Sequence, residues 1–385
     1  MVNDPFALAV AGHALSDAQA ADLALELFVV GYEGQELPAE YADFLRRGLS
    51  GAILFRRNLH YDEQGTVDID LLVAHTASIH AAGQGQASQL PVICSVDQEG
   101  GAVARLRAPF TVLPPMRRLG ERGDSDLVRR VGQQLGRELR AAGFNVDYAP
   151  VLDVDTNPAN PIIGDRSFSR DPHEVARMAG ALLQGLQSAG VLGCGKHFPG
   201  HGDTAQDSHL ELPSLPHDLD RLRSVELVPF AKLANELQLV MTAHVLFPAL
   251  DPTWPATLSR QILLPLLRVE CGYQGVIVSD DLEMRGVANV LDAGGCVRRG
   301  LEAGCDLFLV CRQRDTLEHA WQAARAILLE AGDSPLRNRA LDAIGRLRRL
   351  RAGLAPVGSQ VADLQAVLGD STTLALRAEL AAGTL

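Results

Sequence analysis

The fold is decided by the stretch LGCGKHFPGHGDT at residues 192–204, where a short apolar run ends in the ionisable side chains of Lys196 and His197. The same pattern returns at residues 275–284, GVIVSDDLEM, where a run rich in β-branched residues ends at Asp280. Short apolar or β-branched runs bounded by Gly, Pro or polar residues are typical of buried strands. Each segment therefore predicts a strand that carries polar side chains at its carboxyl end.

Eight such runs occur along the chain, and stretches long enough for helices separate them. The predicted strands are 27–31, 51–55, 91–96, 144–149, 192–197, 238–243, 276–279 and 306–311. Apolar residues recur at helical spacing over 125–142, 171–189, 222–236, 259–271 and 316–331. Because the strands are apolar almost throughout, they suit a parallel sheet that is covered on both faces.

The polar residues at the strand ends distinguish a closed barrel from an open sheet, which periodicity alone does not. They are Asp97 and Gln98, Asp153, Lys196 and His197, His244, and Asp280, after the third to seventh predicted strands. Ionisable groups on so many strands meet at one point only if the sheet closes. We therefore predict an α/β fold with one (β/α)8 TIM-type barrel domain over residues 1–353, followed by a short C-terminal helical tail over 354–385.

Composition and charge argue against several classes of protein. The 385 residues include 35 Lys and Arg against 47 Asp and Glu, and the formal net charge of −12 would repel a phosphate backbone. The first residues lack the basic start and long apolar run of a signal peptide, and no segment has the roughly 20 apolar residues of a membrane span. We expect a cytoplasmic monomer that binds neither nucleic acid nor membrane.

The six Cys residues include no CxxC pair, so we expect structural thiols.

The loop that follows Lys196 and His197 is unusually polar. Asp207 and His209 are two residues apart, so the carboxylate can accept from one imidazole nitrogen while the other faces a substrate. This pairing would hold a titrating group near neutral pH, as general acid–base catalysis requires. A zinc site is an alternative, although the segment has no HxxxH pair. Lys196 and His197, at a rigid strand end, suit fixed hydrogen bonds to a hydroxylated ligand.

Two carboxylates leave the strand at 276–279 side by side. Alternation along a continuing strand would send Asp280 and Asp281 to opposite sides, so only one is expected to face the barrel axis. For Asp281 we expect a cap on the next helix. An Asp at the mouth of a barrel can attack an anomeric carbon and form a covalent glycosyl-enzyme.

Two further clusters place an acid and an Arg after a strand, at SVDQEGGAVARL (95–106) and IIGDRSFS (162–169). For Asp97, Arg105 and Arg166 we expect a sugar-binding role, because carboxylates and guanidinium groups bind hydroxyl and acetamido groups through several hydrogen bonds. For Glu99 and Asp165 we expect ordinary loop salt bridges, which are common.

Together these motifs resemble glycoside hydrolase family 3, and within it the single-domain bacterial β-N-acetylglucosaminidases. The stretches that carry the resemblance are LFVVGYEG, GAILFRRNL, SVDQEGGAVARLR, FNVDYAPVLDVD, IIGDRSFSRDP, GKHFPGHGDTAQDSH, HVLFPALDPTWPATLS and GVIVSDDLEM. They follow one another in the family's order from about residue 27 to about residue 310.

The resemblance implies a retaining β-N-acetylhexosaminidase with Asp280 as nucleophile, His209 as acid/base and Asp207 as the residue that orients His209. The implied substrate-binding residues are Asp97, Arg105, Arg166, Lys196 and His197. The implied substrate is a small carbohydrate, a muropeptide fragment with N-acetylglucosamine β-1,4-linked to 1,6-anhydro-N-acetylmuramic acid, with or without peptide. Neither a metal nor a cofactor is implied.

The expected reaction has two steps. Asp280 attacks the anomeric carbon while His209 protonates the leaving oxygen, and neutral His209 then activates water, so the anomeric configuration is retained. A phosphorylase on the same scaffold, a non-catalytic sugar-binding barrel and a metal-dependent barrel hydrolase are the alternatives.

Overall fold

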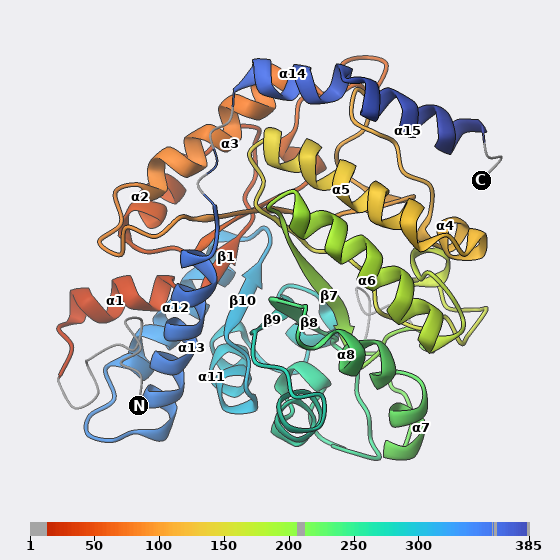
Figure 1. Cartoon of the computed structure of the whole chain (residues 1–385). Coiled ribbons are helices and arrows are strands. Elements are labelled where there is room, and N and C mark those ends of the chain that lie inside the picture. Colours follow the sequence, from red (N-terminus) through yellow and green to blue (C-terminus); the bar gives the residue numbers. More distant parts are fainter. Residues whose placement is uncertain (1–13, 206–211, 356, 358–359, 383–385) are drawn as a thin grey trace.

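The structure, a computed structural model, describes residues 14–205, 212–355, 357 and 360–382. Within these residues parallel strands form a closed barrel with the order β1-β10-β9-β8-β7-β6-β3-β2, surrounded by helices (Figure 1). The barrel strands are β1 (Phe28–Val30), β2 (Gly51–Leu54), β3 (Ile93–Val96), β6 (Val146–Asp147), β7 (Leu192–Phe198), β8 (Leu239–Thr242), β9 (Val276–Asp281) and β10 (Leu307–Val310). The predicted (β/α)8 barrel is confirmed.

Most strands lie within two residues of their predicted bounds, and β6 is the one that is much shorter than predicted. The range 144–149 was expected to be extended throughout, but β6 contains Val146 and Asp147 alone. Pro150 lies just beyond it and has no backbone N–H to donate, so the ladder is interrupted there. Pairing with β7 resumes at one isolated bridge between Val151 and Lys196.

Two predicted helices are also divided. The range 222–236 contains the end of α7 (Leu219–Ser224) and all of α8 (Leu227–Leu233), in which Pro229 is the third residue. Proline is tolerated in the first turn of a helix and not in its interior, so the chain ends one helix and begins another. The range 259–271 contains the short α9 (Arg260–Ile262) followed by a π-helical stretch, Leu263–Glu270.

The other helices cover the barrel or extend it. They are α1 (Asp17–Leu25), α2 (Ala39–Arg47), α3 (Ile69–Gly83), α4 (Met116–Arg122), α5 (Ser125–Ala141), α6 (Pro172–Ser188), α10 (Arg285–Ala288), α11 (Ala293–Ala303), α12 (Arg314–Leu328) and α13 (Pro335–Ala352). Two of them begin within one residue of the predicted start, α5 at Ser125 and α6 at Pro172. The Asp171 side chain accepts from the backbone N–H groups of His173 and Glu174 and caps α6. All six Cys side chains are free and buried, which confirms structural thiols.

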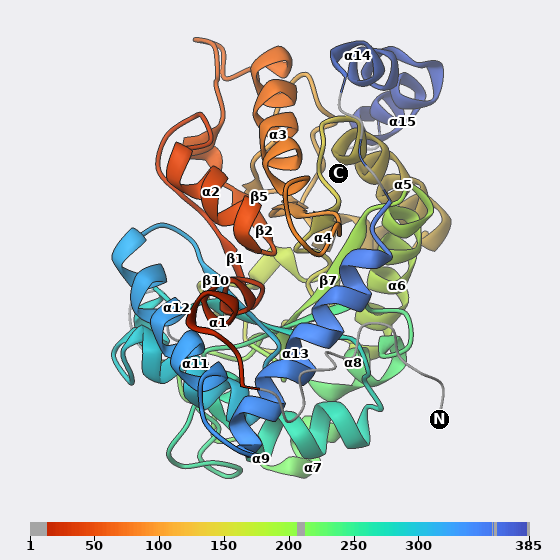
Figure 2. The same ribbon diagram turned by 90° about the vertical axis from the view of Figure 1, so that its left-hand side faces the viewer.

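The tail forms two helices, α14 (Val361–Gly369) and α15 (Ser371–Ala382), which lie beside α5 in both views (Figures 1 and 2). On α15, Arg377 donates to the Pro109 carbonyl at 2.7 Å and to the Thr111 hydroxyl at 3.0 Å. The same guanidinium lies 3.2 Å from the buried carboxylate of Glu138 on α5. The tail is therefore attached to the barrel through a buried polar network as well as through apolar contacts.

No helix in the described part of the chain has the length and apolar character that crossing a bilayer requires.

Candidate active site

A cavity opens at the carboxyl ends of the barrel strands, and its lining joins segments far apart in the sequence. Most of the predicted site residues are among its walls, namely Asp97, Arg105, Arg166, Lys196, His197 and Asp280. Other lining side chains include Phe55, Tyr148, Met241 and Met284. A concave site with apolar walls and a few converging polar groups is typical of small-molecule binding. The convergence of strand ends inferred from the sequence is therefore what the structure shows.

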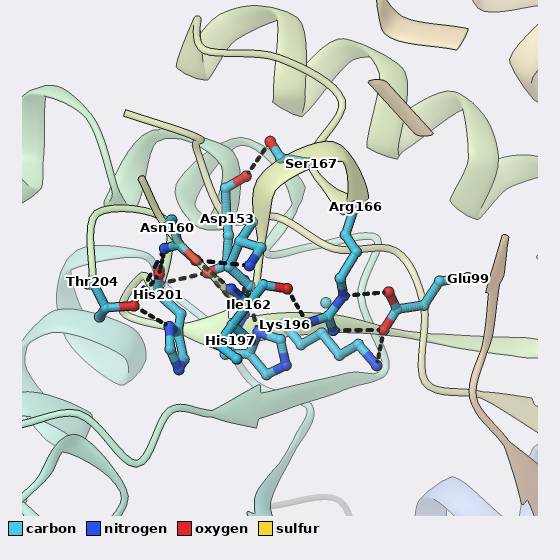
Figure 3. A network of polar contacts seen from close by, with 12 residues as sticks. Glu99, Asp153, Asn160, Ile162, Arg166, Ser167, Lys196, His197, His201 and Thr204 are labelled. Atoms are coloured by element: carbon cyan, nitrogen blue, oxygen red, sulfur yellow. Dashed lines mark hydrogen bonds and ion pairs between the residues drawn. The ribbon is translucent and has the colours of Figure 1, made fainter. Parts of the chain in front are cut away.

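Five charged side chains on one wall alternate in sign. The order is Arg105, Asp97, Lys196, Glu99, Arg166. The Arg105 guanidinium lies 3.6 Å from Asp97, and Lys196 Nζ lies 2.8 Å from Asp97 and 2.6 Å from Glu99. Arg166 meets Glu99 through two parallel hydrogen bonds of 2.8 Å each (Figure 3). We call these five residues the charge row.

The inner members of the charge row are strongly buried, and their pKa values follow from that. Burial alone would lower the pKa of Lys196, but the nearby carboxylates of Asp97 and Glu99 raise it above its ordinary value. Burial would likewise raise the pKa of Glu99, and Arg166 and Lys196 outweigh this and lower it. Both side chains therefore stay charged near neutral pH.

Glu99 does not lie where the sequence predicted, in an ordinary loop salt bridge. It does form ion pairs, as expected, but it is only 2% exposed and lies inside the site instead of in a surface loop. A signal existed in the spacing, because alternation in an extended segment places residues i and i+2 on one face. Asp97 and Glu99, two residues apart at the start of β4 (Gln98–Gly100), both reach Lys196.

Gln98, between these two carboxylates, holds the backbone of the next segment. Its Oε1 accepts from the N–H groups of Arg105 and Leu106 at 2.7 and 2.9 Å, and its Nε2 donates to the Leu106 carbonyl at 2.8 Å. These bonds tie β4 to β5 (Val103–Ala104) and determine where Arg105 leaves the hairpin.

His197 at the end of β7 is oriented by a buried carboxylate. Asp153 Oδ2 lies 2.7 Å from His197 Nδ1, and Oδ1 accepts the His201 backbone N–H at 2.7 Å (Figure 3). Burial would raise the pKa of Asp153, but His197 and His201 lower it. With Nδ1 directed at Asp153, Nε2 is the ring nitrogen that remains for a ligand.

The loop after β7 holds a second buried imidazole, His201. Its Nδ1 lies 2.9 Å from the Thr204 hydroxyl, and its carbonyl accepts from Asn160 Nδ2 at 2.8 Å. Burial, with His197 close by, lowers the pKa of His201 to about 4. Asn160 Oδ1 also accepts the N–H groups of Ile162 and Ile163, so it joins this loop to the segment that carries Arg166.

Asp280 lies at the carboxyl end of β9 and faces the cavity. Burial would raise the pKa of its carboxyl group, yet that pKa is below its ordinary value because His197 and His244 lie close to it. The Asp281 backbone N–H, which donates to Asp280 Oδ1 at 2.8 Å, acts in the same direction. An ionised carboxylate at this position can act as a nucleophile or stabilise positive charge.

The expectation that Asp281 caps the next helix is wrong. Helix α10 begins at Arg285 after Met284. Asp281 Oδ1 instead accepts the backbone N–H groups of Glu283 and Cys311, both at 3.1 Å. Burial and the nearby Glu283 raise the pKa of Asp281 to about 7. The two neighbouring carboxyl groups thus have opposite pKa shifts, because His197 and His244 lie close to Asp280 while Asp281 is buried beside the carboxylate of Glu283.

Two of the predicted catalytic residues, Asp207 and His209, lie outside the described residues.

Asp165 does not form the predicted loop salt bridge, since no ion pair of its side chain is found in the described part of the chain. Among the described residues, no three His, Cys, Asp or Glu side chains gather in a way that could hold a metal ion.

A closed barrel with carboxylates and cations gathered at the carboxyl ends of its strands has the layout of a barrel enzyme. A family model described as the Glycosyl hydrolase family 3 N terminal domain matches residues 26–343. The chain therefore belongs to glycoside hydrolase family 3.

Curated relatives place the chain more narrowly. It is 44% identical over 285 residues to a Beta-hexosaminidase of Chromobacterium violaceum, across 71% of this chain and 75% of the relative. It is 35% identical over 368 residues to Beta-hexosaminidase A of Pseudoalteromonas piscicida, across 90% of this chain. The chain spans 60% of the length of that second relative.

Solved structures agree with these relatives. A family 3 β-N-acetylglucosaminidase from a Paenibacillus species superposes with a TM-score of 0.84 at 36% identity, covering 94% of this chain and 68% of the other. NagZ from Neisseria gonorrhoeae superposes with a TM-score of 0.74 at 35% identity, covering 92% of this chain and 96% of the other. Within family 3 the chain is thus a glycoside hydrolase of the β-N-acetylhexosaminidase kind.

Proposed function

We propose that the chain hydrolyses terminal, non-reducing β-linked N-acetylglucosamine with retention of configuration, through a covalent bond between the sugar and Asp280. The observation that carries this proposal is the position of the Asp280 carboxyl group, which lines the same cavity as the charge row and whose pKa the nearby His197 and His244 lower. The charge row and His197 offer the donors and acceptors that a hydroxylated, acetamido-bearing ring requires.

In the first step Asp280 attacks the anomeric carbon as the leaving oxygen takes a proton. His209, oriented by Asp207, supplies that proton and later removes one from water. His197 and His244 lie close enough to lower the pKa of Asp280, so the nucleophile remains charged between turnovers. Lys196, which acts in the same direction, also holds Asp97 in place.

We further propose that the leaving group is acidic, as in muropeptide fragments released during peptidoglycan recycling. Arg56 and Arg107 are exposed beside the cavity, next to the lining residues Phe55 and Arg105. Both lie near Tyr61, where their charges oppose the rise that burial causes in the pKa of the hydroxyl. In the described part of the chain neither has an ion-pair partner, so both remain available to a carboxylate on the substrate.

The test compares release of 4-nitrophenol from the β-N-acetylglucosaminide and from the β-glucoside, for the natural chain and for Asp280→Ala. We expect selective cleavage of the first and loss of turnover in the variant. Proton NMR of the first-formed sugar should show the β-anomer, and added phosphate should yield no sugar phosphate. Near-normal turnover by Asp280→Ala would remove the nucleophile assignment, and a sugar 1-phosphate would identify a phosphorylase.

The same proposal includes a monomeric enzyme located in the cytoplasm. Light scattering of the purified chain and fractionation of cells that express it with its natural ends test these two points.

A further inference from the structure

We propose that Glu99 is a positioning residue for substrate binding, which acts by holding Arg166 and Lys196 at a fixed separation along the wall of the cavity. The inference rests on the proposed function, in which these two cations bind the sugar. Neither the resemblance nor the expected loop salt bridge gives Glu99 such a role.

The carboxylate of Glu99 has little capacity left for a ligand of its own. Oε2 accepts from Arg166 Nε, and Oε1 accepts from an Arg166 terminal nitrogen and lies 2.6 Å from Lys196 Nζ. The side chain is 2% exposed. A carboxylate in this state organises its partners and does not contact the substrate itself.

Its partners, in contrast, keep donors free. Arg166 has five N–H groups, of which two point to Glu99 and a third to the Ile162 carbonyl at 3.1 Å. Lys196 has three N–H groups, and its nitrogen lies within hydrogen-bond distance of Asp97 and Glu99. Each cation thus keeps at least one N–H group for a sugar oxygen. The direction of that free N–H group is fixed because Glu99 accepts other N–H groups of the same side chain.

Without the charge of Glu99 the row would lose its alternation. Lys196 and Arg166 would become neighbouring cations with no anion between them, and buried like charges repel strongly. The two side chains would separate, and the free donors would no longer match one sugar ring. Because ring contacts of this kind form in the ground state and persist in the transition state, the loss should raise KM more than it lowers kcat.

The test measures KM and kcat for 4-nitrophenyl N-acetyl-β-glucosaminide with Glu99→Gln, Arg166→Met and the double variant. We expect Glu99→Gln to raise KM by roughly tenfold or more with kcat within about threefold, since charged hydrogen bonds carry such factors. In the Arg166→Met background it should add less than about twofold, because a residue that acts through another adds little once that residue is gone. Inhibition by free N-acetylglucosamine should weaken in parallel.

A matched control lies at the other end of the barrel. Asp306 is a fully buried carboxylate that immediately precedes β10, with Arg268 and Arg339 each at 2.6 Å and Arg346 at 3.8 Å. Asp306→Asn makes the same chemical change as Glu99→Gln and should lower the melting temperature while leaving KM within about twofold. A purely structural role for Glu99 would give the same pattern in both variants.

Each outcome has one meaning. If Glu99→Gln has a KM near that of the natural chain, the role of Glu99 is overturned. It is also overturned if the KM of the double variant rises by the product of the factors found in Glu99→Gln and Arg166→Met. An unchanged KM in Arg166→Met overturns instead the proposed sugar contact on which this inference rests. If Glu99→Gln does not fold, Glu99→Asp keeps the charge and shortens its reach, and a KM unchanged in Glu99→Asp also overturns the inference.

Discussion

Asp153 is joined to His197, which lines the cavity, by a 2.7 Å contact between Oδ2 and Nδ1. The same carboxylate accepts the His201 backbone N–H, so one buried anion holds both the imidazole and the start of the following loop.

Replacing Asp153 with Asn should impair substrate binding and turnover through His197. The amide can still accept one N–H bond, but it no longer carries the charge that favours Nδ1–H on His197. We expect kcat/KM for the 4-nitrophenyl substrate to fall by about 10- to 100-fold, as is usual when the partner of a functional His is lost. An unchanged kcat/KM in a folded Asp153→Asn protein would show that His197 needs no orientation.

His201 should make the enzyme less stable in mild acid. Its pKa is about 4 in the folded chain, against an ordinary value near 6.5 in the unfolded chain. A lowered pKa means that the unfolded state binds the proton more readily. The stabilising effect of neutral His201 is therefore complete above about pH 6.5 and declines as the pH falls towards 4.

The measurement is urea unfolding of the natural chain and of His201→Asn at pH 7.5 and pH 5. We expect the difference in the free energy of unfolding between the two proteins to shrink by about 2 kcal/mol between these pH values, as a shift of this size implies. Other titrating groups are common to both proteins and cancel. A difference independent of pH would mean that the pKa of His201 is the same in the folded and the unfolded chain.

The exposed pair Arg56 and Arg107 should matter for acidic leaving groups alone. We expect Arg56→Gln/Arg107→Gln to reduce kcat/KM by about tenfold for a muramic acid-containing disaccharide, an effect that weakens as salt screens it. Hydrolysis of the uncharged 4-nitrophenyl substrate should stay within about twofold. Arg129→Gln/Arg298→Gln, on the outer helices α5 and α11, makes the same change in net charge and serves as the control. Equal losses on both substrates would contradict an acidic leaving group.

Arg377 should stabilise the attachment of the tail. Glu138 is buried and has Arg377 as its cation, so Arg377→Met leaves an uncompensated carboxylate. We expect a loss of about 2–4 kcal/mol in the free energy of unfolding, as is typical when one partner of a buried pair is removed. Arg130→Met breaks the more exposed pair with Glu379 and should cost less than about 1 kcal/mol. Equal effects in the two variants would show that the burial of Glu138 does not matter.

The sequence predicted those parts of the site that depend on strand ends. Asp97, Lys196, His197 and Asp280 follow buried apolar runs, and a closed parallel sheet brings such positions together whatever the loops do. It did not predict the partners of Glu99, because Arg166 comes from a loop 67 residues further along the chain, and its path is set by Asn160 and not by any periodic pattern.

The shortfalls in secondary structure have a similar cause. The division between α7 and α8 and the brevity of β6 both arise at prolines, Pro229 and Pro150, whose effect depends on where the backbone N–H would have donated. Apolar periodicity does not contain that information.

The charge row also constrains which substitutions the site can survive. Its two ends are cations, so loss of Arg105 or Arg166 leaves a row in which every remaining charge still has an opposite neighbour. Loss of Lys196 brings two carboxylates together, and loss of either carboxylate brings two cations together. Divergence towards other sugars should therefore begin at the two terminal arginines, and changes at the three inner positions should occur only as compensated pairs.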